Sequence, residues 1–293
     1  MYSLQGKIAI FYCEHSIMEQ KGTLMAKKSE KKDNVQYFGM DPNIEYIKIH
    51  GLQRSGTNYL SDLMNENFQN TKVLVNLGGW KHGFYSVPWS VGKEVHVLII
   101  VKSPYSWLVS MYKYWGPNKK LNIGPDLSGV SFDDFVRNRV YFERQRDVPF
   151  LFRCSNPVDH WNNMNFHWAS IRMNQKKLCV IPYESLLTDP DKSIQETGSA
   201  LGLKMKSKFK NFDSTFTPAG ENMKPSDQKF TRKEFYLKGD YVDYFTPDLV
   251  EFVNKNLDME LMINFGYEYL APESADDNVV EQEFQTPIYT KGS

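Results

Sequence analysis

The sequence predicts an α/β protein with a P-loop-like central parallel β-sheet that is flanked by helices on both faces. Short, strongly apolar segments alternate with stretches of helical periodicity, which is typical of parallel strands buried on both sides. The most hydrophobic segment, His96–Val101, is expected to be the central strand. The chain has 293 residues, of which 41% are hydrophobic and 24% charged, enough for one large domain.

The individual elements follow from the same pattern. Four strands are expected, at Ile44–His50, Val73–Leu77, His96–Val101 and Leu178–Ile181. Helices are expected where apolar residues recur every three or four positions, or where an acid and a proline mark a helix start. They are Asn58–Phe68, Tyr105–Tyr114, Phe132–Tyr141, Val158–Gln175, a helix after Asp189-Pro190, and Pro247–Phe265. Residues 115–130 are predicted to form a surface loop, and residues 204–238 to be irregular.

Charge divides the chain into three parts. Residues 1–42 form a lysine-rich N-terminal arm, which is expected to be flexible or to add an edge strand, and 43–270 form the folded domain. Residues 271–293 form an acidic tail that is expected to be disordered. The chain has 35 basic and 35 acidic residues, and this balance argues against a long nucleic-acid-binding surface.

The three cysteines predict neither a disulfide framework nor a zinc site. Cys13, Cys154 and Cys179 are far apart and lack the spacing of metal ligands. No apolar run reaches the length of a signal sequence core or a membrane span. A cytoplasmic protein without a membrane span is therefore expected.

The turn after the first predicted strand has the features of a phosphate site. Gly51 and Gly56 have the glycine spacing of a P-loop, and the turn leads into a helix N-terminus, whose free N–H groups suit an anion. The lysine that should follow the second glycine is missing, and the cation stands instead at Arg54. On this turn alone, an ordinary tight turn with an exposed arginine remains an alternative.

A second basic site follows the predicted central strand. Lys102 and Ser103 stand at its carboxyl end, where ligands bind in open α/β sheets, and Ser110 lies in the next helix. A P-loop kinase or ATPase would end this strand with an acid that holds Mg²⁺. A base at this position predicts direct binding of phosphate without a metal ion.

With these motifs the sequence resembles the sulfotransferases that use 3′-phosphoadenosine 5′-phosphosulfate (PAPS). Arg54-Ser55-Gly56-Thr57 is similar to their turn around the 5′-phosphosulfate, and Lys102, Pro104 and Ser110 reproduce the spacing of their 3′-phosphate motif. Lysine replaces the family's arginine at 102, which keeps the charge but loses bidentate binding. Val180–Leu203 resembles a third family segment, in which Tyr183 would lie near the adenine. The resemblance covers about 44–270.

The resemblance also implies the catalytic groups. The family places its base on or after the second strand, and His82 is the candidate there, because an imidazole accepts a proton near neutral pH. Lys81 would stabilise the transferring group or the leaving oxygen, or is a solvated surface lysine. Glu66 and His50 are the rival bases. The family's late Arg-Lys-Gly motif is matched only in part, with Arg232 and Lys238 as candidates.

The sequence thus predicts a sulfotransferase that moves a sulfuryl group from PAPS to the hydroxyl of a small molecule or glycan. Arg54 and the N–H groups of Ser55, Gly56, Thr57 and Asn58 would hold the 5′-phosphosulfate. Lys102 and Ser110 would bind the 3′-phosphate, and 3′-phosphoadenosine 5′-phosphate would be the product. A P-loop kinase of a nucleoside or small metabolite, and a non-catalytic nucleotide-binding protein, are the alternatives.

Overall fold

One parallel sheet forms the centre of the molecule. The computed structural model describes residues 40–75, 77, 79–84, 94–115, 129–138, 154–170, 177–212 and 229–272. Within these ranges the strands are β1 (Glu45–His50), β2 (Thr71–Val73), β3 (Val95–Val101) and β4 (Leu178–Pro182). They pair in the order β2-β1-β3-β4, and every pair is parallel. β2 and β3 lie on opposite sides of β1, so the order in which strands are added to the sheet reverses at β1. In open α/β sheets, ligands bind at such a switch point.

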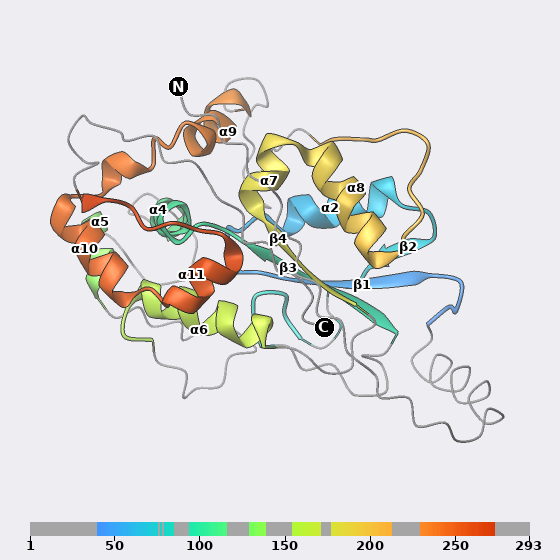
Figure 1. Cartoon of the computed structure of the whole chain (residues 1–293), viewed down its shortest axis with the longest axis horizontal. Helices are drawn as coiled ribbons and strands as arrows, with labels where there is room; N and C mark the ends of the chain where they lie inside the picture. The colour runs from blue at the N-terminus through green and yellow to red at the C-terminus, as the bar shows by residue number, and fades with distance from the viewer. Residues whose placement is uncertain are drawn as a thin grey trace, which may run out of the picture.

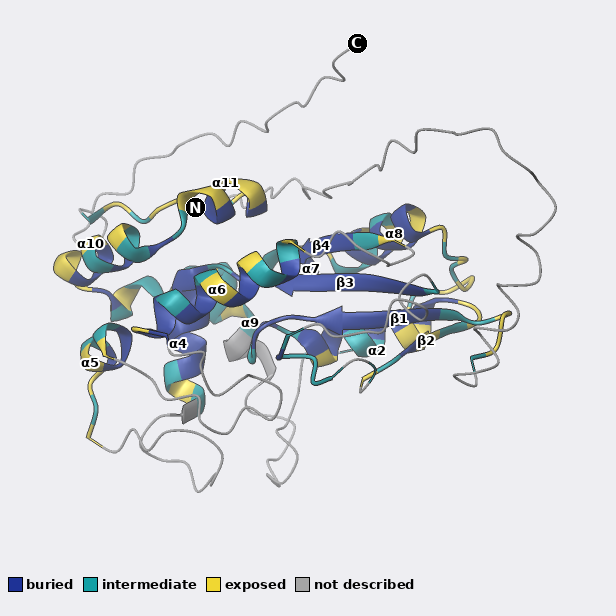
Figure 2. Ribbon diagram, turned by 90° about the horizontal axis from the view of Figure 1, so that it is seen from below, coloured by how far each residue is buried: buried dark blue, intermediate teal, exposed yellow. Residues whose placement is uncertain are grey.

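Helices cover both faces of the sheet, as predicted (Figure 1). Side chains of β3 alternate between two hydrophobic clusters, so that Val97, Ile99 and Val101 face one layer while Leu98 and Ile100 face the other. The strands are buried, and exposed residues lie mainly on the outer helix faces (Figure 2). The first layer contains α4 (Pro104–Trp115), α5 (Phe132–Arg137), α6 (Pro157–Ala169), α10 (Pro247–Asn256) and α11 (Met259–Phe265). The second contains α2 (Thr57–Asn67), α7 (Tyr183–Thr188) and α8 (Pro190–Leu201).

The second strand differs from its prediction. β2 occupies Thr71–Val73, not Val73–Leu77. After Leu74 the chain folds over β1, because the buried ammonium group of Lys48 on β1 donates hydrogen bonds to the carbonyl oxygens of Val75 at 2.8 Å and Gly79 at 2.7 Å. These bonds hold the segment that leads to residues 80–84.

The predicted final helix Pro247–Phe265 is two helices. α10 ends at Asn256, and Leu257 has an extended backbone. Asp258 starts α11, because its carboxylate accepts a hydrogen bond from the N–H of Leu261 and its own N–H donates to the side chain of Asn162 on α6. The break thus depends on a cap and on a tertiary contact, and the apolar periodicity continues across it.

Residues 204–238 are only partly irregular. Lys229–Leu237 form the helix α9, and the short 3₁₀ helix η1 follows at Val242–Tyr244. Lys204, Lys206, Lys208 and Lys210 are exposed.

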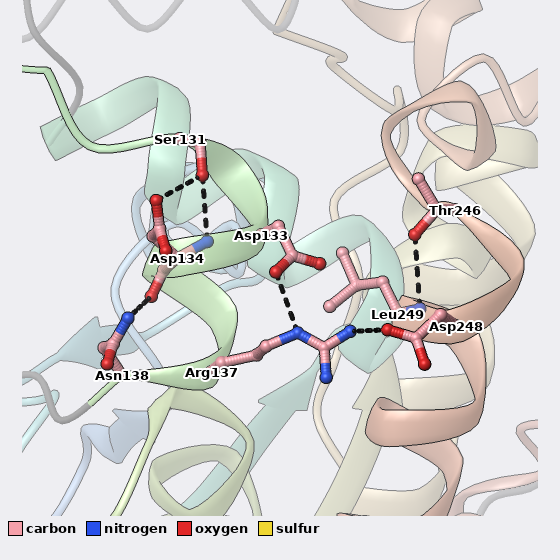
Figure 3. Close-up of polar contacts among 8 residues, drawn as sticks. All are labelled: Ser131, Asp133, Asp134, Arg137, Asn138, Thr246, Asp248 and Leu249. Atoms are coloured by element: carbon pink, nitrogen blue, oxygen red, sulfur yellow. Dashed lines mark hydrogen bonds and ion pairs between the residues drawn. The ribbon is translucent and has the colours of Figure 1, made fainter.

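Hydrogen bonds cap α5 and α10, and an arginine side chain joins the two helices (Figure 3). Ser131 caps α5 by accepting a hydrogen bond from the N–H of Asp134, and Thr246 caps α10 in the same way. Arg137 on α5 donates to Asp133 on its own helix at 2.8 Å and to Asp248 on α10 at 2.5 Å. The arginine therefore fastens α5 to the start of α10.

Replacing Gly198 with alanine is expected to destabilise the protein. Gly198 lies in α8 where the ring of Phe68 comes so close that a Cβ atom would stand 2.2 Å from its Cε1. One of the two elements must shift, and overpacking of this kind costs about 1–3 kcal/mol. Urea unfolding would measure the loss, with Ser199→Ala at the exposed neighbouring position as control. A Gly198→Ala variant as stable as Ser199→Ala would contradict the close packing.

Several predicted segments lie outside the described residues. They are most of the N-terminal arm 1–42, most of the acidic tail 271–293, most of the predicted loop 115–130, and the ends of two predicted helices at 139–141 and 171–175. Among the helices that are described, none has the length and apolar character needed to cross a membrane.

Candidate active site

The turn between β1 and α2 brings an open helix N-terminus to the carboxyl edge of the sheet. Gly56 has φ 92° and precedes α2, whose N-terminus has no side-chain cap. A Cβ atom on Gly56 would stand 2.5 Å from the ring of Tyr183, so glycine is required by both backbone conformation and space. The first N–H groups of a helix lack intrahelical partners. Those of Thr57 and Asn58 are therefore in place to bind an anion.

The predicted anion ligands within this turn are not equivalent. Ser55 donates both its hydroxyl, at 2.6 Å, and its backbone N–H, at 3.1 Å, to the carbonyl oxygen of Leu52. Ser55 therefore closes the turn. We had expected its N–H to bind an anion, but this N–H is bonded to the carbonyl oxygen of Leu52. Arg54 has φ 67°, and its guanidinium group lies over the ring of Tyr114, 5.0 Å from the centroid. Its Nε is buried and has no hydrogen-bond partner among the described residues.

The second basic site forms around Lys102, directly after β3. Lys102 is 2% exposed, and its Nζ donates to the hydroxyl of Ser110 at 3.1 Å. The ammonium group also faces the rings of Tyr236, at 3.6 Å, and Tyr183, at 4.8 Å. Burial lowers the pKa of Lys102 well below its usual value, while the nearby Glu184 raises it. This ammonium group has three donors but only one oxygen acceptor among the described residues, and an anion would supply further acceptors.

Tyr183 and Glu184, at the start of α7, connect the two basic sites. The ring of Tyr183 packs against Gly56 on one side and faces Lys102 on the other. Glu184 accepts hydrogen bonds from the N–H of Ser103 at 3.0 Å and from the hydroxyl of Tyr267 at 2.9 Å. Tyr183 was predicted as a ligand of the adenine, whereas the bracing by Glu184 was not predicted. Both follow β4, which pairs directly with β3.

His82 lies against the first turn in a defined tautomer. Its Nδ1 is 2.6 Å from the carbonyl oxygen of Gly51, and the N–H of Gly51 donates to the carbonyl oxygen of Lys81 at 3.2 Å. Burial lowers the pKa of His82 to about 3, so the imidazole is neutral at pH 7. Because a carbonyl only accepts, Nδ1 holds the proton, and Nε2 keeps a lone pair that can accept another.

Lys81 is partly buried rather than a solvated surface lysine. Its Nζ donates to the side-chain oxygen of Asn58 in the first turn of α2. Burial lowers the pKa of Lys81, and the nearby Asp62 raises it. Lys81, Asn58 and His82 thus come together beside the turn. Trp80 packs edge-on against His82, with ring centroids 4.8 Å apart.

The two rival bases are placed less favourably than His82. Glu66 pairs with Lys210 at 3.0 Å on the outer face of α2, where 45% of its side chain is exposed. His50 is fully buried in β1, whereas His82 is only partly buried, and this exposure distinguishes them because burial lowers the pKa of both to about 3. Among the described residues, no group of three or more His, Cys, Asp or Glu side chains is arranged to hold a metal ion.

Of the two late basic candidates, the structure describes only the side chain of Lys238. Lys238 directly follows α9, is exposed, and pairs with Glu234 on that helix at 3.2 Å. Arg232 lies on α9, but its side chain is outside the described part of the chain. The contact from α9 comes instead from Tyr236, whose hydroxyl is 2.7 Å from that of Ser110. The sequence did not predict this contact, because only basic residues of this segment were considered as ligands.

Comparison with known families assigns the chain. A family described as sulfotransferase domain matches residues 82–266, more than half of the sequence. The match begins at His82 and includes Lys102, Ser110 and Tyr183, while the turn with Arg54 precedes it. A search of curated proteins found no match. The family match and the parallel sheet with its two basic sites agree, and the chain belongs to the sulfotransferase domain family.

Proposed function

We propose that this protein transfers a sulfuryl group from PAPS to a hydroxyl acceptor, with His82 as the general base. The family supports sulfotransfer in general. The observation that supports this donor is the buried ammonium group of Lys102, held against Ser110 at the carboxyl edge of the sheet. A buried ammonium group that has one oxygen acceptor among the described residues favours an anionic ligand.

The residues at this edge fit a nucleotide with phosphate groups at both ends. The N–H groups of Thr57 and Asn58 and the guanidinium group of Arg54 stand at one site, and Lys102 with Ser110 stands at the other. Tyr183 lies between them, in contact with both, and supplies an aromatic face for a base. Binding both ends of the donor fixes the direction in which its sulfuryl group points.

PAPS supplies an activated sulfuryl group whose bond to the 5′-phosphate oxygen breaks during transfer. His82 accepts the proton of the acceptor hydroxyl at Nε2 while the acceptor oxygen bonds to sulfur. The Gly51 carbonyl holds the imidazole in the tautomer that makes Nε2 the free nitrogen. Arg54 and Lys81 stabilise the negative charge that collects on the leaving 5′-phosphate oxygen.

Binding of two nucleotides tests the donor site. Wild-type protein is expected to bind adenosine 3′,5′-bisphosphate at least tenfold more tightly than adenosine 5′-monophosphate, because only the former has a phosphate for Lys102. Lys102→Met is expected to remove this preference, as measured by calorimetry. Lys206→Met, at an exposed lysine, is the control. Transfer of labelled sulfate from PAPS to a panel of hydroxyl acceptors then identifies the reaction.

A different result would favour one of the alternatives. Thermal stabilisation by ATP and Mg²⁺, with none by the bisphosphate, would contradict the proposal and favour a kinase. Tight binding of the bisphosphate without transfer to any acceptor in the panel would favour a nucleotide-binding protein that is not an enzyme.

A further inference from the structure

We propose that Tyr236 on α9 is the third side chain of the 3′-phosphate site, where its phenol O–H donates to a phosphate oxygen beside Lys102 and Ser110. This inference rests on the proposed function, because it assigns a further residue to the donor site. It gives Tyr236 a role in choosing between 3′-phosphorylated nucleotides and their unphosphorylated analogues.

Three polar groups converge at this place. Ser110 lies in the middle, with its hydroxyl 3.1 Å from the Nζ of Lys102 and 2.7 Å from the hydroxyl of Tyr236. The three groups come from the end of β3, from α4 and from α9. A phosphate monoester offers three oxygens, each of which accepts hydrogen bonds. One donor for each oxygen is therefore available from these three side chains.

Tyr236 is held in this place by its own packing. Its ring lies edge-on to that of Tyr183, with centroids 6.3 Å apart, and the neighbouring Phe235 covers the ammonium group of Lys113 at 3.6 Å. The ring of Tyr236 also lies closer to the ammonium group of Lys102 than the ring of Tyr183 does. These contacts orient the phenol toward the base of the site instead of toward solvent.

A third donor compensates for the hydrogen bond that is lost because residue 102 is a lysine and not an arginine. Lysine at 102 is a point charge, whereas an arginine would offer two parallel N–H groups to the phosphate. Lys238 does not make up the difference in the described contacts, because it pairs with Glu234 on the exposed side of α9. The hydroxyl of Tyr236 provides a directional donor that replaces the second N–H group.

Replacing Tyr236 with phenylalanine removes only the hydroxyl and tests the role directly. The variant is expected to bind adenosine 3′,5′-bisphosphate roughly tenfold more weakly, since a hydrogen bond to a charged group is lost. Binding of adenosine 5′-monophosphate is expected to be unchanged. Calorimetry on the full chain measures both. The matched control is Tyr112→Phe, which removes a hydroxyl that donates to the carbonyl oxygen of Val130 and is expected to leave both affinities as in wild type.

Two results would overturn the inference while the proposed function stands. One is a wild-type preference for the bisphosphate that Tyr236→Phe leaves intact. The other is a Tyr236→Ala variant that binds the bisphosphate more tightly than wild type, because the phenol would then be competing with the phosphate. Equal binding of both nucleotides by wild type would instead overturn the proposed function and the inference with it. Thermal unfolding verifies that each variant is folded.

Discussion

Replacing His82 with alanine is expected to lower kcat by about 10²- to 10⁴-fold, which is the usual contribution of a general base. The neutral imidazole presents Nε2 as its free nitrogen because Nδ1–H is bound to the carbonyl oxygen of Gly51. Binding of adenosine 3′,5′-bisphosphate is expected to be unchanged, since Lys102 and Ser110 remain in place. Steady-state kinetics with PAPS and calorimetry together separate the two effects.

Controls distinguish loss of the base from damage to the loop. His82→Asn keeps a side-chain N–H that can donate to the Gly51 carbonyl, and it is expected to be as inactive as His82→Ala. Added imidazole is expected to restore part of the activity of His82→Ala by replacing the missing base. Glu66→Gln is expected to keep wild-type kcat, since Glu66 pairs with Lys210 on the outer face of α2. A His82→Ala variant with kcat within threefold of wild type would contradict the assignment of His82 as the general base.

The second large effect is on stability in acid. Burial lowers the pKa values of His50, His82 and His160 to about 3 in the folded protein, against about 6.5 in the unfolded chain. Between these values the unfolded state binds more protons, so stability is lost as the pH falls below 6.5. Each histidine contributes about 1.4 kcal/mol per pH unit, and the three together remove about 4 kcal/mol by pH 5.5.

Urea unfolding between pH 7.5 and 5 would measure this loss. The variant His160→Gln isolates one histidine, because glutamine does not titrate and the His160 ring packs against Trp107 and Cys154 and not against His50 or His82 in the described contacts. As the pH falls, this variant is expected to lose about 1.4 kcal/mol less stability per pH unit than wild type. Parallel curves for the two proteins would show that His160 is not kept neutral by burial.

The sheet and the two basic sites could be predicted because their signals are local. Apart from His96, β3 is a continuous apolar run, and Lys102 follows it directly. Gly51 and Gly56 bound the turn after β1, and the recurring apolar residues that follow predicted a helix from Asn58, one residue after the observed start of α2 at Thr57. Parallel pairing then brings the ends of β1 and β3 to the same edge.

Features that depend on distant contacts could not be predicted in this way. The break between α10 and α11 needs Asn162, which stands 96 positions before Asp258. The early end of β2 results from a buried lysine on another strand, Lys48. Tyr236 and Ser110 are 126 positions apart in the sequence, and the basic residues near Tyr236 led to the prediction of Arg232 and Lys238 instead. Tertiary packing decides each of these, and one sequence contains no periodic signal for it.

The double contact between Gly51 and the loop of Lys81 and His82 has a consequence for how acceptor choice can change. Gly51 donates to Lys81 and accepts from His82, so any displacement of the donor turn moves the imidazole with it. Trp168 adds a further bond, from its indole N–H to the carbonyl oxygen of Gly83. Two hydrogen bonds therefore couple the position of His82 directly to that of the donor turn. Substitutions in the surrounding segments can then reshape the fit of the acceptor while the alignment of base and donor is preserved.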